Sequence, residues 1–178
     1  MSCTLEVGFG MGDNFKNMID IDQKGIFIGC DPYLNGLVNL LTQLQQKDYE
    51  RVKIFNKDVR LLFEMLPRNF FSKIIILFPD PWPKRRHKKR RLLNEININY
   101  FLKALEKNGV IYFGTDSENY FSQVREFFLQ KGKSFLITNS QNFTKLPSLL
   151  CKTKYAKKAI AKGLIPKYLV VKKKVDIL

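Results

Sequence analysis

Short hydrophobic runs, several of them rich in β-branched residues, alternate along the chain with segments in which apolar residues recur at a helical period. The short runs predict strands at residues 4–7, 25–30, 52–55, 73–78 and 110–114. The helical repeats predict helices at residues 14–20, 35–46, 60–65, 94–105 and 119–130. Two further strand candidates, in a less regular tail, are residues 135–138 and 168–172. This alternation predicts an α/β fold with a mostly parallel central sheet and helices on both faces.

The composition is typical of one globular domain, which we expect to span residues 1–178. Hydrophobic residues make up 45% of the chain and aromatic residues 13%, which is enough for a buried core and excludes a disordered chain. The longest apolar run, residues 74–78, is far shorter than the roughly 20 residues that cross a membrane. Cys3, Cys30 and Cys151 are odd in number and widely spaced, which favours a reducing, cytoplasmic location. With one histidine in the chain, they predict no metal site.

Positive charge is concentrated in two segments. The formal net charge is +15, yet residues 1–83 hold 9 basic and 10 acidic residues, and residues 92–144 hold 5 of each. Residues 84–91 contain seven Lys or Arg residues around one His, and residues 145–178 contain ten Lys against one Asp. A run this dense repels itself unless a polyanion neutralises it, and binding to phosphates releases counterions. We therefore expect a nucleic acid as the partner, and no membrane, because no amphipathic basic helix is evident.

Acidic residues gather at the predicted carboxyl ends of the strands, where open α/β sheets bind ligands. They are Glu6 in the first strand and, after the next four strands, Asp31, Asp58, Asp80 and Asp116. The first strand leads into a turn with glycine at positions 8, 10 and 12, which lets a ligand approach the backbone closely. This glycine spacing is not the one typical of dinucleotide binding, which disfavours a nicotinamide dehydrogenase. An acidic rim suits a nucleoside without phosphates, such as S-adenosylmethionine, because carboxylates accept hydrogen bonds from ribose hydroxyl and amino groups.

The residues that follow the central predicted strand form the most distinctive motif, Phe78-Pro79-Asp80-Pro81-Trp82-Pro83-Lys84. Its three prolines stiffen the exit from the strand and fix Asp80 there. The chain's one tryptophan, Trp82, either stacks on a base or packs in the core. The basic run begins within this motif, and His87 in that run is interpreted as a phosphate contact rather than a catalytic base. The motif therefore indicates a base pocket that opens onto a phosphate track.

The glycine turn at residues 5–12 and the proline-tryptophan motif with its basic run closely resemble the bacterial tRNA (guanine-N7-)-methyltransferase family. The resemblance continues through residues 114–116 and 153–155 and so covers nearly the whole chain. It implies a Rossmann-like class I methyltransferase fold that depends on S-adenosylmethionine. The implied reaction is methyl transfer to N7 of a guanosine in the variable loop of tRNA, which makes tRNA the expected partner.

The resemblance also implies a role for particular residues. Asp80 is the implied catalytic residue. The implied cofactor-binding residues are Glu6, Gly8, Gly10, Asp31, Asp58 and Asp80. The target nucleotide is implied to lie against Lys84, Asp116, Thr153, Lys154, Tyr155 and Ala156. The residues implied to contact RNA are Arg86, His87, Lys88, Lys89, Arg90 and Arg91.

The chain departs from the family pattern at several places. Asp31 stands where Glu is common, Pro83 where His is common, and Ala156 where a Glu is expected. The first predicted strand also begins almost at residue 1, without the family's N-terminal extension. These departures leave an alternative open, which is an RNA-binding protein that retains the methyltransferase fold with little or no catalytic activity.

Overall fold

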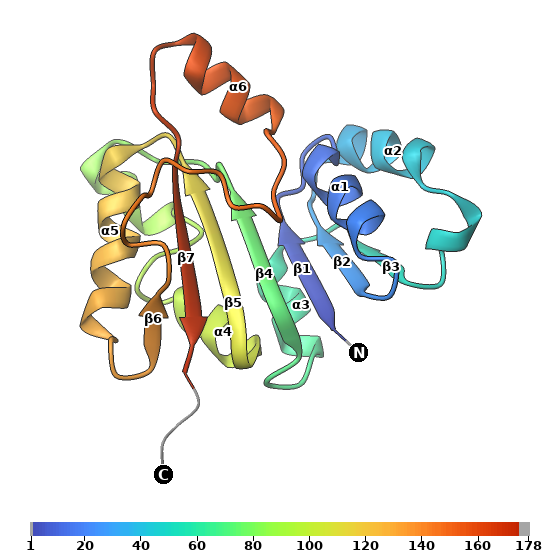
Figure 1. The fold of residues 1–178 in the computed structure, drawn as a ribbon, viewed down its shortest axis with the longest axis horizontal. Helices are drawn as coiled ribbons and strands as arrows, with labels where there is room; N and C mark the ends of the chain where they lie inside the picture. Colours follow the sequence, from blue (N-terminus) through green and yellow to red (C-terminus); the bar gives the residue numbers. More distant parts are fainter. Residues whose placement is uncertain (1, 175–178) are drawn as a thin grey trace.

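One seven-stranded sheet forms the centre of the computed structural model, which describes residues 2–174 (Figure 1). Across the sheet the strands run in the order β3 (Val52–Phe55), β2 (Ile26–Cys30), β1 (Cys3–Val7), β4 (Phe71–Leu77), β5 (Leu105–Thr115), β7 (Lys167–Lys173) and β6 (Phe135–Ile137). The first five strands in this order are parallel, and β7 pairs antiparallel with both β5 and β6. The carboxyl ends of the parallel strands therefore meet at one edge.

Helices cover both faces of the sheet. The helices are α1 (Asp13–Ile21), α2 (Leu34–Gln43), α3 (Val59–Met65), α4 (Ile98–Ala104), α5 (Glu118–Gln130) and α6 (Lys154–Ala161), with short 3-10 helices η1 (Gln46–Asp48) and η2 (Arg85–Arg90). Side chains of α3, α4 and α5 share one hydrophobic cluster with the sheet, and side chains of α1 and α2 belong to a second. The predicted fold class, mostly parallel with helices on both faces, is confirmed.

Strand β4 is buried on both sides, as its continuous hydrophobic sequence predicts. Ile74, Ile75 and Ile76 are all 0% exposed. Ile74 and Ile76 face the cluster that contains α3, α4 and α5, whereas Ile75 and Leu77 face the one that contains α1. This burial holds β4 firmly in the sheet, and the proline-tryptophan motif begins directly after it.

The predicted helix at residues 94–105 is shorter in the structure, where α4 spans Ile98–Ala104. Asn94 Oδ1 accepts hydrogen bonds from the amides of Ile96 and Asn97, and this side-chain turn delays the start of the helix. Strand β5 begins directly at Leu105 and is irregular near its start, where the pairing register with β4 shifts and Asn108 has a φ of 63°. Residues 107–109, which directly follow the predicted helix, lie in this irregular part of β5.

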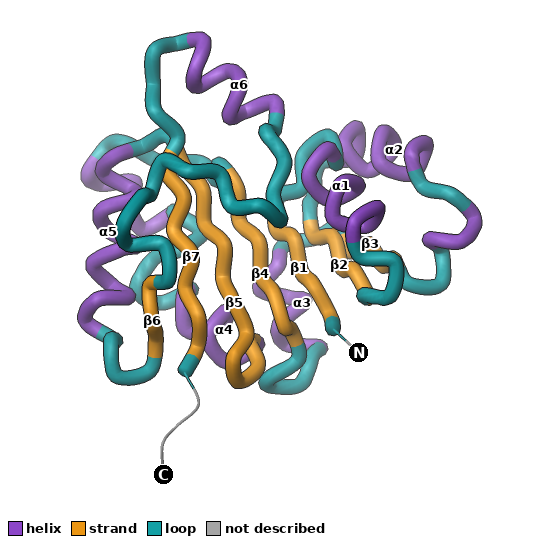
Figure 2. The backbone as a smooth tube through the Cα atoms, viewed as in Figure 1, coloured by secondary structure: helices purple, strands orange, loops and turns teal. Residues whose placement is uncertain are grey.

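Helix α6 was not predicted from the sequence, which showed only a less regular tail there. It follows a long loop, drawn in teal in Figure 2. Leu146, Leu149 and Leu150 of this loop pack in the second cluster. Figure 1 shows α6 above the carboxyl ends of the strands. Within residues 2–174, no helix combines the length and the apolar sequence needed to cross a membrane.

Candidate functional site

The glycine turn after β1 is held in place by Asp31. Gly8, Gly10 and Gly12 all have positive φ, at 73°, 55° and 89°, a conformation that favours residues without Cβ. The Gly10 amide donates to Asp31 Oδ2 at 2.7 Å, and the Tyr33 amide donates to Asp31 Oδ1 at 2.9 Å. Asp31 is 7% exposed, so its buried carboxylate holds the turn in place. Asp31 lines neither of the two cavities of the site, but the residues after it do, Pro32 in one and Tyr33 in the other.

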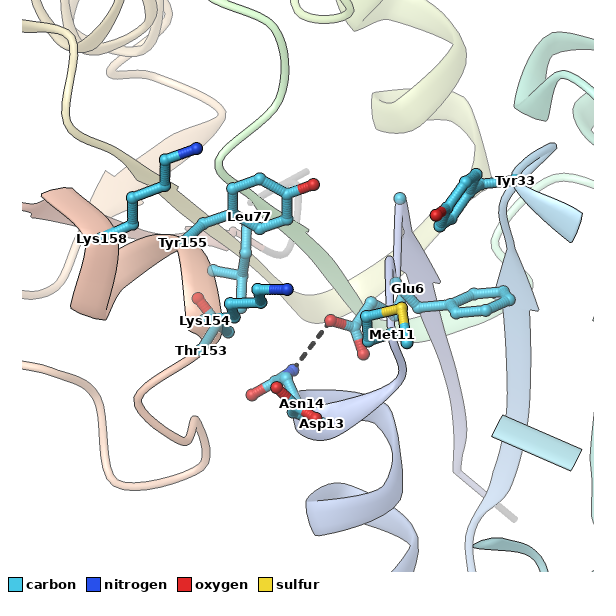
Figure 3. Close-up of a pocket in the computed structure, with 12 residues that line it drawn as sticks. Glu6, Met11, Asp13, Asn14, Tyr33, Leu77, Thr153, Lys154, Tyr155 and Lys158 are labelled. Atoms are coloured by element: carbon cyan, nitrogen blue, oxygen red, sulfur yellow. Dashed lines mark hydrogen bonds between the residues drawn. The ribbon is translucent and has the colours of Figure 1, made fainter. Parts of the chain in front are cut away.

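A cavity of about 300 Å³ lies beyond the turn, between β1, α1 and α6 (Figure 3). It is lined by Glu6 and Gly8 from the β1 end and by Thr153, Lys154 and Tyr155 from α6 and its cap. Figure 3 shows the α6 side chains across the cavity from Glu6. The structure thus brings together predicted site residues from opposite ends of the sequence.

Glu6 is the most unusual side chain of this cavity. It is 2% exposed, and its Oε1 accepts from Asn14 Nδ2 at 3.0 Å. Its Oε2 is buried and has no hydrogen-bond partner within residues 2–174. Burial, the largest cause, and the nearby Asp31 and Asp13 carboxylates together raise the pKa of Glu6 to about 8, although the Asn14 hydrogen bond lowers it. The free oxygen of this buried carboxyl group can accept a hydrogen bond from a ligand, and a cationic ligand group would favour the charged form of Glu6.

Glu6→Gln is expected to remove a pH dependence of stability. The pKa of Glu6 is about 8 in the folded chain, above its ordinary value of 4.5, so the folded state keeps a proton that the unfolded chain releases. This stabilisation is complete below the ordinary pKa and is lost as the pH rises through 8, at up to about 1.4 kcal/mol per pH unit. Denaturant unfolding between pH 6 and pH 9 should show the wild-type free energy of unfolding falling relative to that of the variant. A constant difference between the two proteins would contradict the assignment.

A second cavity, of about 690 Å³, meets the first at Gly8. Its lining includes Asp58, Asp80, Trp82, Lys89 and Arg90. Asp58 caps α3 by accepting from the Arg60 amide, and the ion pair with Arg60 at 2.6 Å holds the pKa of its carboxyl below the usual range. Asp80 is exposed on the loop that leaves β4. Two predicted carboxylates therefore share one cavity with two predicted RNA contacts.

The loop that carries Asp80 has a strained backbone. Phe78 and Trp82 adopt φ values of 51° and 42°, which are uncommon for side chains of this size. The Trp82 ring is half-buried, with the Arg90 guanidinium 5.1 Å from its centre and the His87 ring edge-on at 5.8 Å. Trp82 therefore lines the cavity and packs against the basic run, rather than entering the hydrophobic core.

Lys84 and Asp116 are not among the residues that line either cavity. Lys84 is exposed at the start of η2, where its carbonyl accepts from the His87 amide. Asp116 is half-buried directly after β5 and precedes Ser117, which caps α5. Both lie on loops at the carboxyl edge of the sheet, outside the enclosed part of the site.

Two of the residues predicted to contact RNA or substrate are buried in the structure. Arg91, expected to contact RNA, is 0% exposed and donates hydrogen bonds to Pro81, Gln123 and Asn119. Ala156, expected to contact substrate, is 1% exposed, and its amide donates to the Thr153 hydroxyl that caps α6. A Glu side chain at position 156 would start from the buried face of α6.

Sequence reasoning missed Asn14, Tyr33 and Lys158, which also line the first cavity. Asn14 bridges two parts of the site, because its Nδ2 donates to Glu6 and its Oδ1 accepts from the Cys151 amide. One signal was available, since Asn14 is a polar residue on the buried side of α1. Lys158 stands one helical turn after Lys154 and could be found only once α6 was recognised.

A family model described as "Putative methyltransferase" matches residues 1–166 of the chain. The chain is 34% identical over 166 residues to a tRNA (guanine-N(7)-)-methyltransferase of Azorhizobium caulinodans, with 93% of this chain and 72% of the relative covered. It is 35% identical over 167 residues to a bifunctional methyltransferase of Rickettsia felis. That match covers 94% of this chain, which spans about a third (32%) of the Rickettsia protein.

Solved structures show the same fold at low sequence identity. An rRNA methylase from Streptococcus thermophilus superposes with a TM-score of 0.66 at 12% identity, covering 98% of this chain and 87% of that chain. A "putative methyltransferase" from Streptococcus mutans, solved in complex with SAH, gives a TM-score of 0.59 at 11% identity, covering 97% and 89%. The class I methyltransferase fold is therefore confirmed.

Proposed function

The chain belongs to the methyltransferase family that includes the Azorhizobium enzyme, and we propose that it methylates N7 of a guanosine in tRNA, using S-adenosylmethionine. The observation that carries the proposal is the pair of cavities joined at Gly8, with Glu6 in one and Asp80 in the other. The pair lies at the carboxyl edge of the sheet, where folds of this class bind their ligands. Labelled methyl transfer to unfractionated tRNA tests the proposal, and absence of label with a folded protein would exclude it.

The residues present fit S-adenosylmethionine. Its ammonium group matches the free, buried Oε2 of Glu6, which has no partner among the described residues. Its ribose hydroxyls match Asp31, whose carboxylate oxygens keep lone pairs beyond the hydrogen bonds from Gly10 and Tyr33. Its adenine matches the second cavity, which holds Asp58. When bound, the cofactor supplies a methyl group on a positively charged sulfur.

The proposed reaction needs no general base. Guanine N7 carries a free lone pair, so the N7–methyl bond forms as the sulfur–methyl bond breaks, and no proton leaves first. Positive charge moves from sulfur to the guanine ring in this step. A fixed carboxylate such as Asp80 stabilises the charge that develops on the base, which is catalysis by positioning and electrostatics. Thr153, Lys154 and Tyr155, which line the first cavity across from Glu6, would hold the target nucleotide. Lys84 and Asp116 would contact it from the loops outside the cavity.

Asp31→Ala is expected to weaken S-adenosylmethionine binding by about 1.5–3 kcal/mol, because the variant cannot form a charge-assisted hydrogen bond with the cofactor. The missing hydrogen bonds from Gly10 and Tyr33 add to this effect, since both hold the glycine turn. Calorimetry with the cofactor measures the change. The matched control is Asp20→Ala, which removes a half-exposed carboxylate of α1 that pairs with Lys16. Equal affinities for the two variants would remove Asp31 from the site.

The exposed cations of η2 give the phosphate backbone of tRNA a defined place to bind in this proposal. Changing Arg85, Arg86 and Lys89 together to Ala should weaken binding to all tRNAs, because phosphates carry no base sequence. The plot of log K against log salt concentration should flatten by roughly 0.7–0.9 for each phosphate that the variant no longer neutralises.

The matched control for this triple variant removes three exposed lysines near the opposite edge of the sheet, Lys103, Lys107 and Lys133. It has the same net charge as the test variant, so a general charge effect would change both salt slopes alike. Affinity for S-adenosylmethionine should stay constant in both, because exposed charges beyond a Debye length of about 8–10 Å are screened. Identical slopes for the test variant and the wild type would show that η2 makes no phosphate contacts.

A further inference from the structure

A buried arginine connects α5 to the loop that carries Asp80. Arg91 is the largest of the fully buried side chains among residues 2–174. Its Nε donates to the Pro81 carbonyl at 2.7 Å, its Nη1 to Gln123 Oε1 at 2.5 Å and its Nη2 to Asn119 Oδ1 at 2.9 Å. Its guanidinium carbon also lies 4.7 Å from the centre of the Tyr120 ring. Pro81 stands directly between Asp80 and Trp82, so the first of these bonds holds the motif itself.

Stability alone does not account for this arrangement, because burying the charged guanidinium costs desolvation free energy. The guanidinium donates to neutral oxygens in all three of these hydrogen bonds, and burial lowers the pKa of Arg91 from its ordinary value. An apolar side chain of similar volume fills such a site without the desolvation of a charge. The energetic argument therefore points to a role for the hydrogen bonds beyond packing.

The same stretch of α5 also holds the far end of the basic run. Tyr120 is 0% exposed, and its hydroxyl accepts from the Leu93 amide at 2.8 Å. Gln123 Nε2 donates to the Leu93 carbonyl at 3.4 Å. Pro81 precedes η2 and Leu93 follows it. Helix α5 therefore holds both ends of the segment with the basic run, Pro81 through Arg91 and Leu93 directly.

We infer that Arg91 is a positioning residue, which fixes Asp80 relative to the glycine turn by holding the Pro81 carbonyl against α5. The inference rests on the proposed function, because it assigns Asp80 a place beside the reacting base. The hydrogen bond to the Pro81 carbonyl also constrains the peptide before Trp82, whose φ of 42° is uncommon and needs support from surrounding contacts. It acts on the geometry of Asp80 and leaves the Glu6 side of the site untouched.

Arg91→Met tests this inference, because Met fills much of the volume and donates no hydrogen bond. Trp82 is the chain's one tryptophan, so its fluorescence reports on the loop directly. Acrylamide quenching of Trp82 should increase, and kcat for tRNA methylation should fall by about a hundredfold, the effect of a misplaced catalytic group. Affinity for S-adenosylmethionine should fall by much less than kcat, because Arg91 makes no contact with Glu6 or Asp31. The matched control is Arg125→Met, an exposed arginine of α5 that packs on Phe143 and should change neither readout.

A second variant keeps the test decisive if Arg91→Met does not fold. Asn119→Ala removes one acceptor at an exposed side chain, and it should shift Trp82 quenching and kcat in the same direction by smaller amounts. Unchanged quenching and unchanged kcat in whichever of the two variants folds would overturn the inference. Failure of the proposed function looks different, because the wild-type chain itself would then transfer no methyl group to tRNA.

Discussion

Asp80→Ala is expected to lower the rate of methyl transfer to tRNA by about a hundred- to a thousandfold, the range typical of removing one preorganised electrostatic group. Asp80 stands at the exit of the central strand and lines the cavity that also holds Trp82 and Arg90. Its side chain is exposed, so the substitution leaves the core intact and the fold should persist. The variant therefore separates chemistry from folding.

Single-turnover kinetics with saturating cofactor and tRNA measure this effect. Glu64→Ala is a suitable control, because Glu64 is an exposed carboxylate of the neighbouring helix α3 and does not line either cavity. Unfolding curves of both variants should match that of the wild type to within about 0.5 kcal/mol, as for most surface substitutions. A folded Asp80→Ala protein with most of its activity would remove Asp80 from the catalytic role.

Gly36→Ala is expected to disrupt the cofactor site by displacing the glycine turn, against which helix α2 packs. A Cβ at position 36 would lie 1.9 Å from the Gly10 carbonyl oxygen and 2.8 Å from the Gly10 carbonyl carbon. Both contacts are with backbone, so no side-chain rotation relieves them, and the glycine turn must move. Overpacking of this kind costs about 1–3 kcal/mol of stability. Affinity for S-adenosylmethionine should fall by at least about tenfold, or 1.4 kcal/mol, because the displaced turn no longer donates its hydrogen bond to Asp31.

The neighbouring residue provides the control for this prediction. Asn35→Ala introduces the same methyl side chain at an exposed position of α2, where it should raise helix propensity slightly and leave cofactor affinity unchanged. Calorimetry for binding and thermal unfolding for stability separate the two effects. If Gly36→Ala binds S-adenosylmethionine as tightly as Asn35→Ala does, then the contact between α2 and the turn has no part in cofactor binding.

Much of the fold follows from local sequence patterns. The predicted strand at residues 52–55 matches β3, and the one at residues 110–114 lies within the longer β5, because both segments are rich in β-branched and aromatic residues. Helix α6 was missed because its buried face consists of the small residues Ala156 and Ala159, which give a weak periodic signal. A short amphipathic helix of this kind is recognisable only when the sheet edge that it covers is known.

The candidate site was also predictable only in part. Positions at strand ends follow from topology, so Glu6, Asp31 and Asp80 could be chosen from the sequence. The sequence could not show which cations of the basic run are buried and which are exposed. Arg91 differs from Arg90 only in its hydrogen-bond acceptors on α5, which are about 30 residues away in the sequence. Charge density predicts a polyanion surface, whereas hydrogen-bond partners decide which arginine is buried.

Identification of the methylated atom in the product tests the central claim most directly. Wild-type protein is incubated with S-adenosylmethionine carrying a labelled methyl group and with unmodified tRNA, and the RNA is then digested to nucleosides. Chromatography with mass spectrometry should place the label in 7-methylguanosine, and Asp80→Ala should reduce that signal without adding another. Label in a different nucleoside, or an unlabelled tRNA that nevertheless binds the folded protein, would contradict the account.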